Sequence, residues 1–218
     1  VATDRQRVEE IREEAPLSIR TVNRTVARED YEINALKLTQ VARALMLTSN
    51  EDVAVQENKG TLYVIPVGGG LPSASLKADV LTQVTVTFPN TLTFEVSVLD
   101  PLFLDVNIST VVDPVEGATP ATAKAQIEAA LAAHFNPETA DGTINTAIDF
   151  GFRFIETTGD PEGKLPWSDI HNVIRDLSLV RKIDDGNDGL LLNNLRADVA
   201  LLLREFPRLG TVTVINAA

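Results

Sequence analysis

The sequence has 218 residues, 44% of them hydrophobic and 23% charged, and its formal net charge is −12. This length and composition exclude a disordered or fibrous chain and allow a sizeable buried core. The excess of acidic residues argues against nucleic acid or a membrane surface as a partner, because phosphate binding needs clustered cations. Cysteine is absent, which excludes a disulfide framework, a thiolate metal site and a cysteine nucleophile.

The apolar runs are only a few residues long, so the sequence predicts neither a membrane span nor a signal segment. We therefore expect a protein that is made and kept in a cytoplasm. The chain begins with Val1 and not with methionine. This start predicts a processed product or a part of a longer protein.

The first elements along the chain are predicted to be helices. Thr3 and Gln6 have the spacing of a capping box, which predicts a helix over residues 4–14 that ends before Pro16. An acidic first turn, which complements the helix dipole, predicts a second helix over residues 27–38.

Alternating apolar residues then predict strands. The segment 41–47 begins a sheet or leads into one, and residues 53–55 and 62–66 are predicted to form a hairpin with a turn at 58–60. Apolar residues at helical spacing then predict a helix over residues 76–84.

The next elements complete a recognisable order. Strands are predicted at 94–98 and 102–112, and the second has one buried and one solvent-exposed face. A threonine N-cap followed by proline predicts a helix over 120–135, and a further strand is placed near 148–154. From residue 61 to about 155 the order is strand, helix, strand, strand, helix, strand, which is typical of an open-faced ferredoxin-like sandwich.

The last part of the chain has mixed signals. Residues 156–166, rich in glycine, proline and charge, predict a long loop or a domain junction. A capped helix follows from 167 to about 177, two strands flank the acidic run at 184–189, and residues 211–215 form a closing strand. The leucines of 190–203 fit either a helix or a pair of strands.

The predicted fold class is therefore α+β, in three parts. These are a helical N-terminal segment (1–50), a ferredoxin-like α/β sandwich domain (51–155) and a smaller C-terminal α+β domain (156–218).

Two segments resemble ligand-binding loops. The glycines at 68–70 stand between a strand and a helix, but they lack the lysine of a phosphate loop and the spacing of a dinucleotide motif. We interpret them as a connector in which glycine supplies positive φ angles. The run 184–189 places carboxylates as a calcium loop does, yet the twelfth position would be Leu195 and not glutamate. We interpret this run as the tip of a hairpin.

The remaining polar residues suggest no catalytic group. His134 and His171 are the only histidines, and each is interpreted as a helix-surface or interface residue because no second histidine stands at ligand spacing. The carboxylate pairs at 13–14 and 184–185 point apart or lie exposed, and no serine elbow exists. We predict no catalytic residue, no metal site and no cofactor.

The segment 15–32 resembles a signature of the baseplate J-like family, in which an Ala-Pro is followed by an Arg-x-Val and then by an Asp-Tyr. Residues 41–44, 62–66 and 205–214 are similar to the family's sequence in the same order. The resemblance extends over nearly the whole chain, with departures at 138–166 and in the acidic run near 184. The matching motif residues are Pro16, Arg24, Val26, Asp30, Tyr31, Pro207 and Gly210.

This resemblance implies a wedge subunit of the baseplate of a contractile phage tail. Such a protein belongs to the virion and is assembled in the cytoplasm of the bacterial host. Its partners would be copies of itself and other wedge and hub proteins, without nucleic acid, membrane or small-molecule substrate. It would not be an enzyme, and it would transmit the contraction trigger by a change of packing between rigid domains.

Subunit interfaces of this kind need aromatic anchors with a polar rim. Plain core packing is the alternative for each aromatic residue, and we favour it for Tyr31 and for Phe135, a further aromatic that we considered. The candidate interface residues are Tyr31, Phe103, Trp167 and Phe206.

Three other functions remain open. The first is the equivalent baseplate subunit of a non-phage contractile injection system. The second is a carbohydrate- or ligand-binding module, which would display aromatic side chains on a sheet, although aromatic residues make up only 5% of this chain. The third is an enzyme, which a bound metal or nucleotide, or a deep pocket with displaced pKa values, would favour.

Overall fold

The structure is a computed structural model that describes residues 24–186 and 188–216. Helices and several sheets occur along the described chain, which confirms the predicted α+β class. The chain packs as two compact units, one ending at Asp100 and the other beginning at Pro101. The predicted division into three parts, with boundaries after residues 50 and 155, stays a prediction. The predicted helix over 4–14 lies outside the described residues.

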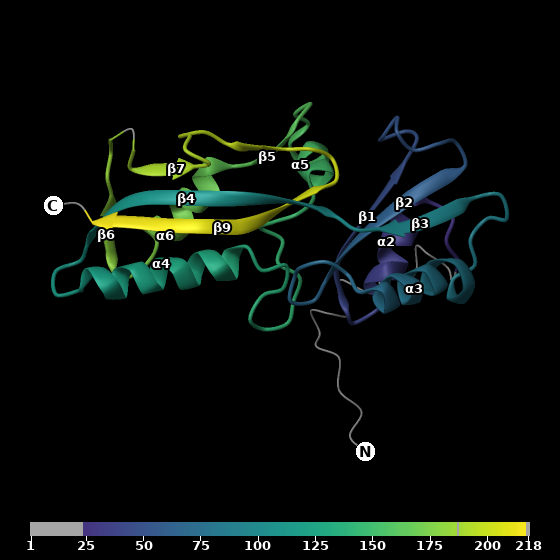
Figure 1. Cartoon of the computed structure of the whole chain (residues 1–218), viewed down its shortest axis with the longest axis horizontal. Coiled ribbons are helices and arrows are strands. Elements are labelled where there is room, and N and C mark those ends of the chain that lie inside the picture. The colour runs from purple at the N-terminus through teal and green to yellow at the C-terminus, as the bar shows by residue number, and fades with distance from the viewer. Residues whose placement is uncertain (1–23, 187, 217–218) are drawn as a thin grey trace, which may run out of the picture. The chain divides into compact units, whose positions relative to one another are not determined.

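The first unit contains a three-stranded sheet (Figure 1). Its order is β1 (Val41–Thr48), β2 (Lys59–Pro66) and β3 (Glu95–Leu99). β1 and β2 are antiparallel, whereas β2 and β3 are parallel. A parallel pair needs a crossover connection, and a helix between the two strands provides it.

Helices α2 (Arg28–Leu36) and α3 (Ala74–Thr82), with the short π-helix η1 (Gln83–Thr87), pack against one face of this sheet. Both predicted helices of this region are thus confirmed. Helices and strands share one apolar core. It comprises Tyr31, Ala35, Val41, Ala44, Met46, Leu62, Val64, Leu76, Val80, Val84 and Val96.

The predicted hairpin is wrong in its first strand. β2 pairs with β1, and Val53 lies fully exposed in the connection between them, with 100% of its surface accessible. β1 offers seven consecutive buried residues, whereas Val53 and Val55 stand among polar neighbours. The segment that can bury more apolar surface therefore takes the place beside β2. The turn into β2 includes Asn58, whose φ is 60°.

The glycine connector after β2 has the predicted conformation. Gly68, Gly69 and Gly70 have φ angles of 85°, 79° and 81°, in the left-handed region that glycine adopts without steric cost. This part of the chain therefore makes the turn from β2 toward α3.

The second unit is built around the long strand β4 (Leu102–Pro114), which confirms the predicted strand. β9 (Glu205–Asn216) runs parallel along one edge of it. β7 (Leu190–Leu192) and β6 (Val180–Ile183) pair antiparallel with successive parts of β4. β9 pairs with residues of β4 that also pair with β7 and β6, so these two short strands must follow one another along the opposite edge of β4.

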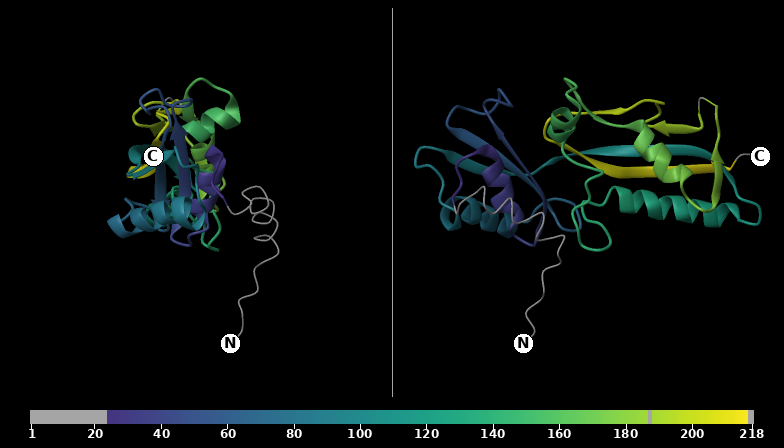
Figure 2. Two further views of the ribbon diagram at one scale, coloured as in Figure 1. Left: turned by 90° about the vertical axis from the view of Figure 1, so that its right-hand side faces the viewer. Right: turned by 180° about the vertical axis from the view of Figure 1, so that it is seen from behind.

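Two helices complete this unit. α4 (Pro120–His134) begins with the predicted cap, in which the Thr119 hydroxyl accepts a hydrogen bond from the N–H of Thr122. α6 (Trp167–Arg175) packs against α4 and lies across the sheet when it is viewed from behind (Figure 2). α4 runs beside β9 (Figure 1). The apolar side chains that these two helices bury completely are Ala123, Ile127, Leu131, Ile170 and Ile174.

The strand predicted near 148–154 is wrong. α5 (Gly151–Thr158) occupies most of it and packs on the pair formed by β5 (Gly163–Leu165) and β8 (Val199–Leu201). The alternating apolar pattern corresponds to alternating burial only at Ile148 and Phe150. Both side chains are completely buried in the extended residues that lead into α5. The helix that follows packs on β5 and ends the extended segment.

The six elements predicted as one ferredoxin-like sandwich are therefore distributed over two sheets. β2 and β3 belong to the first unit and β4 to the second. The run 184–189 is also not a hairpin tip, since its flanking strands β6 and β7 pair with β4 and not with each other. Val111 lies opposite the run: its N–H donates to Gly189 and its carbonyl accepts from Asp184, both at 2.9 Å. The run is a loop that interrupts one edge strand.

Candidate interaction surfaces

The predicted contact aromatics divide into core and surface residues. Tyr31 and Phe206 are each 2% exposed, and Phe135 is 6% exposed, so all three pack inside their units. Phe103 and Trp167 are half-buried. Because a contact residue must present its ring to a partner, these two are the members of the predicted set that stay available.

Trp167 is held by groups that lie far from it in the sequence. Its backbone N–H donates to Asp198 at 2.8 Å, and its indole N–H donates to the Leu190 carbonyl at 3.1 Å. The ring stacks on His171 with centroids 4.8 Å apart, and the guanidinium of Arg196 lies 5.4 Å from its centroid. The predicted cap of α6 by its own first residues is thus replaced by Asp198. Trp167 and Arg196 are thus held in fixed positions at the surface. Tryptophan and arginine are both enriched in interface hot spots.

Phe103 is the outer member of a row of aromatic rings. It meets Phe206 edge to face at 6.4 Å, and Phe206 meets Phe150 at 5.3 Å. The guanidinium of Arg208 lies 5.1 Å from the Phe103 centroid and is paired with Asp105 at 2.7 Å. A half-buried ring with a charged rim has the anatomy of an interface residue.

The motif segment that enters α2 is anchored by residues that sequence reasoning did not select. Arg24 is exposed and Val26 is 55% exposed, whereas Thr25 between them is completely buried. The Thr25 hydroxyl donates to the Phe88 carbonyl at 2.8 Å and accepts from the Asn34 amide at 2.9 Å. No local spacing reveals this pair, since its partners are supplied by the folded chain.

The next two motif residues fix the start of α2. The Asp30 carboxylate accepts from the N–H groups of Val26 at 3.0 Å and Ala27 at 2.9 Å. Tyr31 packs on Phe94 with centroids 5.5 Å apart, and burial raises the pKa of its hydroxyl. Both residues have clear structural roles inside the unit. Pro16 lies outside the described residues.

The motif residues near the end of the chain lie in β9. Pro207 is buried, and Gly210 stands where β9 carries an extra residue relative to β4. Asn107 fills this bulge, because its side-chain oxygen accepts from the N–H of Thr211 at 2.9 Å. A Cβ atom at Gly210 would lie 2.5 Å from the same oxygen. The glycine therefore allows the bulge to close.

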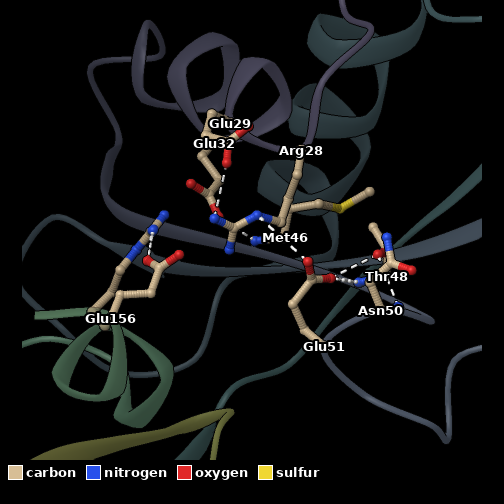
Figure 3. A network of polar contacts seen from close by, with 9 residues as sticks. Arg28, Glu29, Glu32, Met46, Thr48, Asn50, Glu51 and Glu156 are labelled. Atoms are coloured by element: carbon tan, nitrogen blue, oxygen red, sulfur yellow. Dashed lines mark hydrogen bonds and ion pairs between the residues drawn. The ribbon is translucent and has the colours of Figure 1, made fainter. Parts of the chain in front are cut away.

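A network of charged residues ties α2 to the end of β1 (Figure 3). Arg28 pairs with Glu29 at 2.9 Å and approaches Glu51 at 3.9 Å. Glu51 also accepts from the N–H and hydroxyl of Thr48, and buried Glu32 accepts from a β1 backbone N–H at 2.8 Å. Since these carboxylates are engaged in ion pairs and hydrogen bonds, we assign them a structural role and no acid–base chemistry.

The other chemical motifs give no site. In residues 24–186 and 188–216, no group of three or more histidine and acidic side chains is placed to hold a metal ion. Over the same residues, no helix is long and apolar enough to cross a membrane. The loop at 184–189 is tied to β4 through its own backbone.

His134 is the last residue of α4. Burial lowers the pKa of its imidazole, and the negative charge of Asp169 partly offsets this effect. The Nε2 atom is buried without a hydrogen-bond partner among the described residues. The folded state therefore favours neutral His134.

This burial predicts a pH dependence of stability. The ordinary histidine pKa is 6.5, so as pH falls through that value the unfolded chain binds a proton before folded His134 does. The free energy of unfolding should fall between about pH 7.5 and about pH 5.5. In the His134→Gln variant, the part of this decrease in unfolding free energy that comes from His134 should be absent. Urea unfolding of both proteins at the two pH values measures it. Equal pH dependence in the two proteins would contradict this assignment.

Comparisons with known proteins identify the fold. No family model matches the chain, and no curated protein matches it. A chain of the anti-feeding prophage (AFP) baseplate, from a six-fold symmetrised cryo-EM structure, has a similar fold, with a TM-score of 0.63 over 97% of this chain and 12% sequence identity. This chain spans 42% of the length of that chain. The likeness shows a shared fold, and membership of the baseplate J-like family stays a prediction.

Proposed function

We propose that this protein is a structural subunit of a baseplate. The observation that carries the proposal is that its fold resembles a baseplate chain over 97% of its length. Both compact units take part in that likeness, because so little of the chain lies outside it. The role is one of shape and contact surfaces, and it assigns no bond-making step to the protein.

In its finer form, the proposal is a wedge subunit of the baseplate J-like family in a contractile tail. The sequence segment 15–32 and the closing segment 205–214 support it. The subunit would bind copies of itself and other wedge and hub proteins, be assembled in the bacterial cytoplasm and become part of the particle. Rearrangement of packed surfaces would then transmit the contraction trigger.

A baseplate subunit of a non-phage contractile injection system is the second candidate. The specific observation in its favour is that the chain with the similar fold comes from the baseplate of an anti-feeding prophage. Both candidates use the protein in the same way and differ in the particle that contains it.

Deletion of the gene in a strain that produces contractile particles tests the proposal. We expect the deletion strain to yield no particles with a complete baseplate, and a plasmid copy of the gene to restore them. In particles purified from the complemented strain, mass spectrometry should detect the protein and cryo-EM should place its fold in the baseplate. Normal baseplates in the deletion strain would overturn the proposal.

A further inference from the structure

The central sheet of the second unit has one edge that is formed by β9. In the described chain, β9 pairs with β4 and with no other strand. The bulge at Gly210 divides β9 into two parts, and the part after the bulge follows β4 from Thr211 to Asn216. We call the outward-facing backbone of residues 211–216 the free edge of β9.

Hydrogen bonds on the far side of β4 show which way its backbone groups point. The backbone groups of Asn107 and Val111 form hydrogen bonds of 2.8–2.9 Å with the chain on the β6–β7 side. The backbone groups of successive strand residues point to opposite edges. Those of Ile108 and Thr110 therefore point toward β9.

The register between the two strands then gives the direction of the β9 backbone. Thr213 lies beside β4 between Ile108 and Thr110, so its N–H and carbonyl point to β4. The N–H and carbonyl groups of its neighbours Val212 and Val214 point the opposite way, to the free edge. Among the described residues, none of these four outward groups has a hydrogen-bond partner.

The other edges of the two larger sheets are protected against pairing with another chain. Water hydrates the backbone groups of any exposed edge, but proteins usually block or shorten such edges. In the first sheet, the Glu32 carboxylate accepts from the N–H of Met46 in β1 at 2.8 Å, and β3 has only five residues. In the second sheet, the loop 184–189 interrupts the edge opposite β9.

The free edge of β9 has none of these protections. Residues 209–216 include no charged residue and no proline, and residues 211–215 are all β-branched, which favours strands. Thr211, Thr213 and Ile215 are exposed, and the two valines between them are half-buried. No described segment therefore covers this part of β9 completely, and its edge is open to another strand.

We propose that the free edge of β9 pairs with the same edge of a second copy of this chain. The two strands run antiparallel about a two-fold axis at Thr213. Val212 of each copy then stands opposite Val214 of the other, and each such pair exchanges two N–H···O bonds. All four outward groups of each copy gain a partner in this arrangement.

A second copy is the occupant that the residues of this strand favour. The pairing places valine against valine on one face and β-branched side chains against each other on the opposite face. Each copy has a net charge of −12, so two copies can approach closely only where charged side chains are absent, as they are in residues 209–216. A strand of another protein is the alternative occupant, and it predicts that the purified chain does not pair through β9.

Pairing through β9 provides one of the contacts between copies that the proposed function includes, and in this respect it rests on that function. The two can fail separately. Cross-linking of the purified chain tests the β9 pairing, whereas particle assembly in the deletion strain tests the baseplate role.

Cysteine cross-linking tests the pairing, because the chain contains no cysteine of its own. Thr213→Cys places two thiols directly opposite each other in a pair without mutual hydrogen bonds, where the Cα atoms are about 4.5 Å apart, a separation that a disulfide spans. We expect oxidation of the purified variant by diamide to give a covalent dimer with twice the 23.6 kDa mass of the chain. Reduction should return the monomer.

Thr211→Cys is the matched control, because it changes the same residue type two positions away on the same face. Its two thiols would be about four residues apart along the paired strands, or roughly 13 Å, so the cross-link should be lost. A mixture of Thr211→Cys and Ile215→Cys should form a mixed dimer, since these positions stand opposite each other. Equal dimer yields from Thr213→Cys and Thr211→Cys, or no dimer in the mixture, would overturn the proposal.

Val214→Pro blocks the free edge without removing a hydrogen bond to β4. The N–H of Val214 points outward, and edge strands tolerate proline at such positions. In sedimentation velocity, the mean mass of the unmodified chain should rise with concentration. Val214→Pro should abolish this rise and Val214→Ala should retain it, with circular dichroism confirming that both are folded. An unmodified chain that stays monomeric at every concentration would also overturn the proposal.

Discussion

Leu131→Ala should lower the free energy of unfolding of the second unit by about 2–5 kcal/mol. Leu131 lies on the inner side of α4 and is completely buried. The substitution removes buried apolar atoms and leaves a cavity that the packed helix and sheet fill only in part. The measurement is urea unfolding followed by fluorescence of Trp167, the single tryptophan, which reports on this same unit.

Leu195→Ala is the matched control for this prediction. It removes the same atoms from the same unit, but Leu195 is 66% exposed. Its effect should stay within about 0.5 kcal/mol, as for most surface substitutions. If the two variants lost equal stability, the assignment of α4 to the core would be wrong.

Gly151→Ala should destabilise the second unit by about 3 kcal/mol. Gly151 begins α5 beside the residue that follows β8, and a Cβ atom there would lie 2.2 Å from the carbonyl oxygen of Leu202. That obstacle is backbone, which cannot move aside by rotating a side chain. The intrinsic preference of a helix for alanine over glycine, about 1 kcal/mol, is too small to offset the clash. Trp167 fluorescence during urea unfolding again provides the measurement.

Gly186→Ala makes the same chemical change where the obstacle can move. The added Cβ would lie 2.8 Å from a carboxylate oxygen at the exposed end of Asp184. Rotation of that side chain relieves the contact, so we expect a change within about 0.5 kcal/mol. A loss at Gly186 as large as that at Gly151 would show that backbone crowding is not the cause.

Helix prediction succeeded where the signals were local. The N-cap at Thr119 and the proline after it predicted the start of α4. Asp30 likewise marks the start of α2, where its carboxylate satisfies two free N–H groups. Each of these signals acts over a few residues, so it is readable before the chain folds.

Prediction failed where distant segments compete for one place. Val53 and Val55 alternate like a strand, but β1 buries more apolar surface beside β2. Residues 148–154 alternate as well, yet most of them form α5, which packs on β5. Neither outcome is encoded in the segment itself, because each depends on the surface that another segment offers.

The burial of the candidate interface residues also depended on distant parts of the chain. Residue type alone selected Phe103, Trp167, Tyr31 and Phe206, since aromatic side chains serve interfaces and cores equally well. Burial separated them, leaving Phe103 and Trp167 at the surface.

The sequence by itself determined the α+β class, most helix positions, the long strand β4 and the absence of cysteine chemistry. These properties follow from composition, caps and periodicity, which act locally. Only the tertiary structure decided which strands pair, how the sheets are divided between two units and which aromatic side chains stay partly exposed. The physical reason is that burial and pairing are set by long-range contacts, and these exist only once the chain has folded.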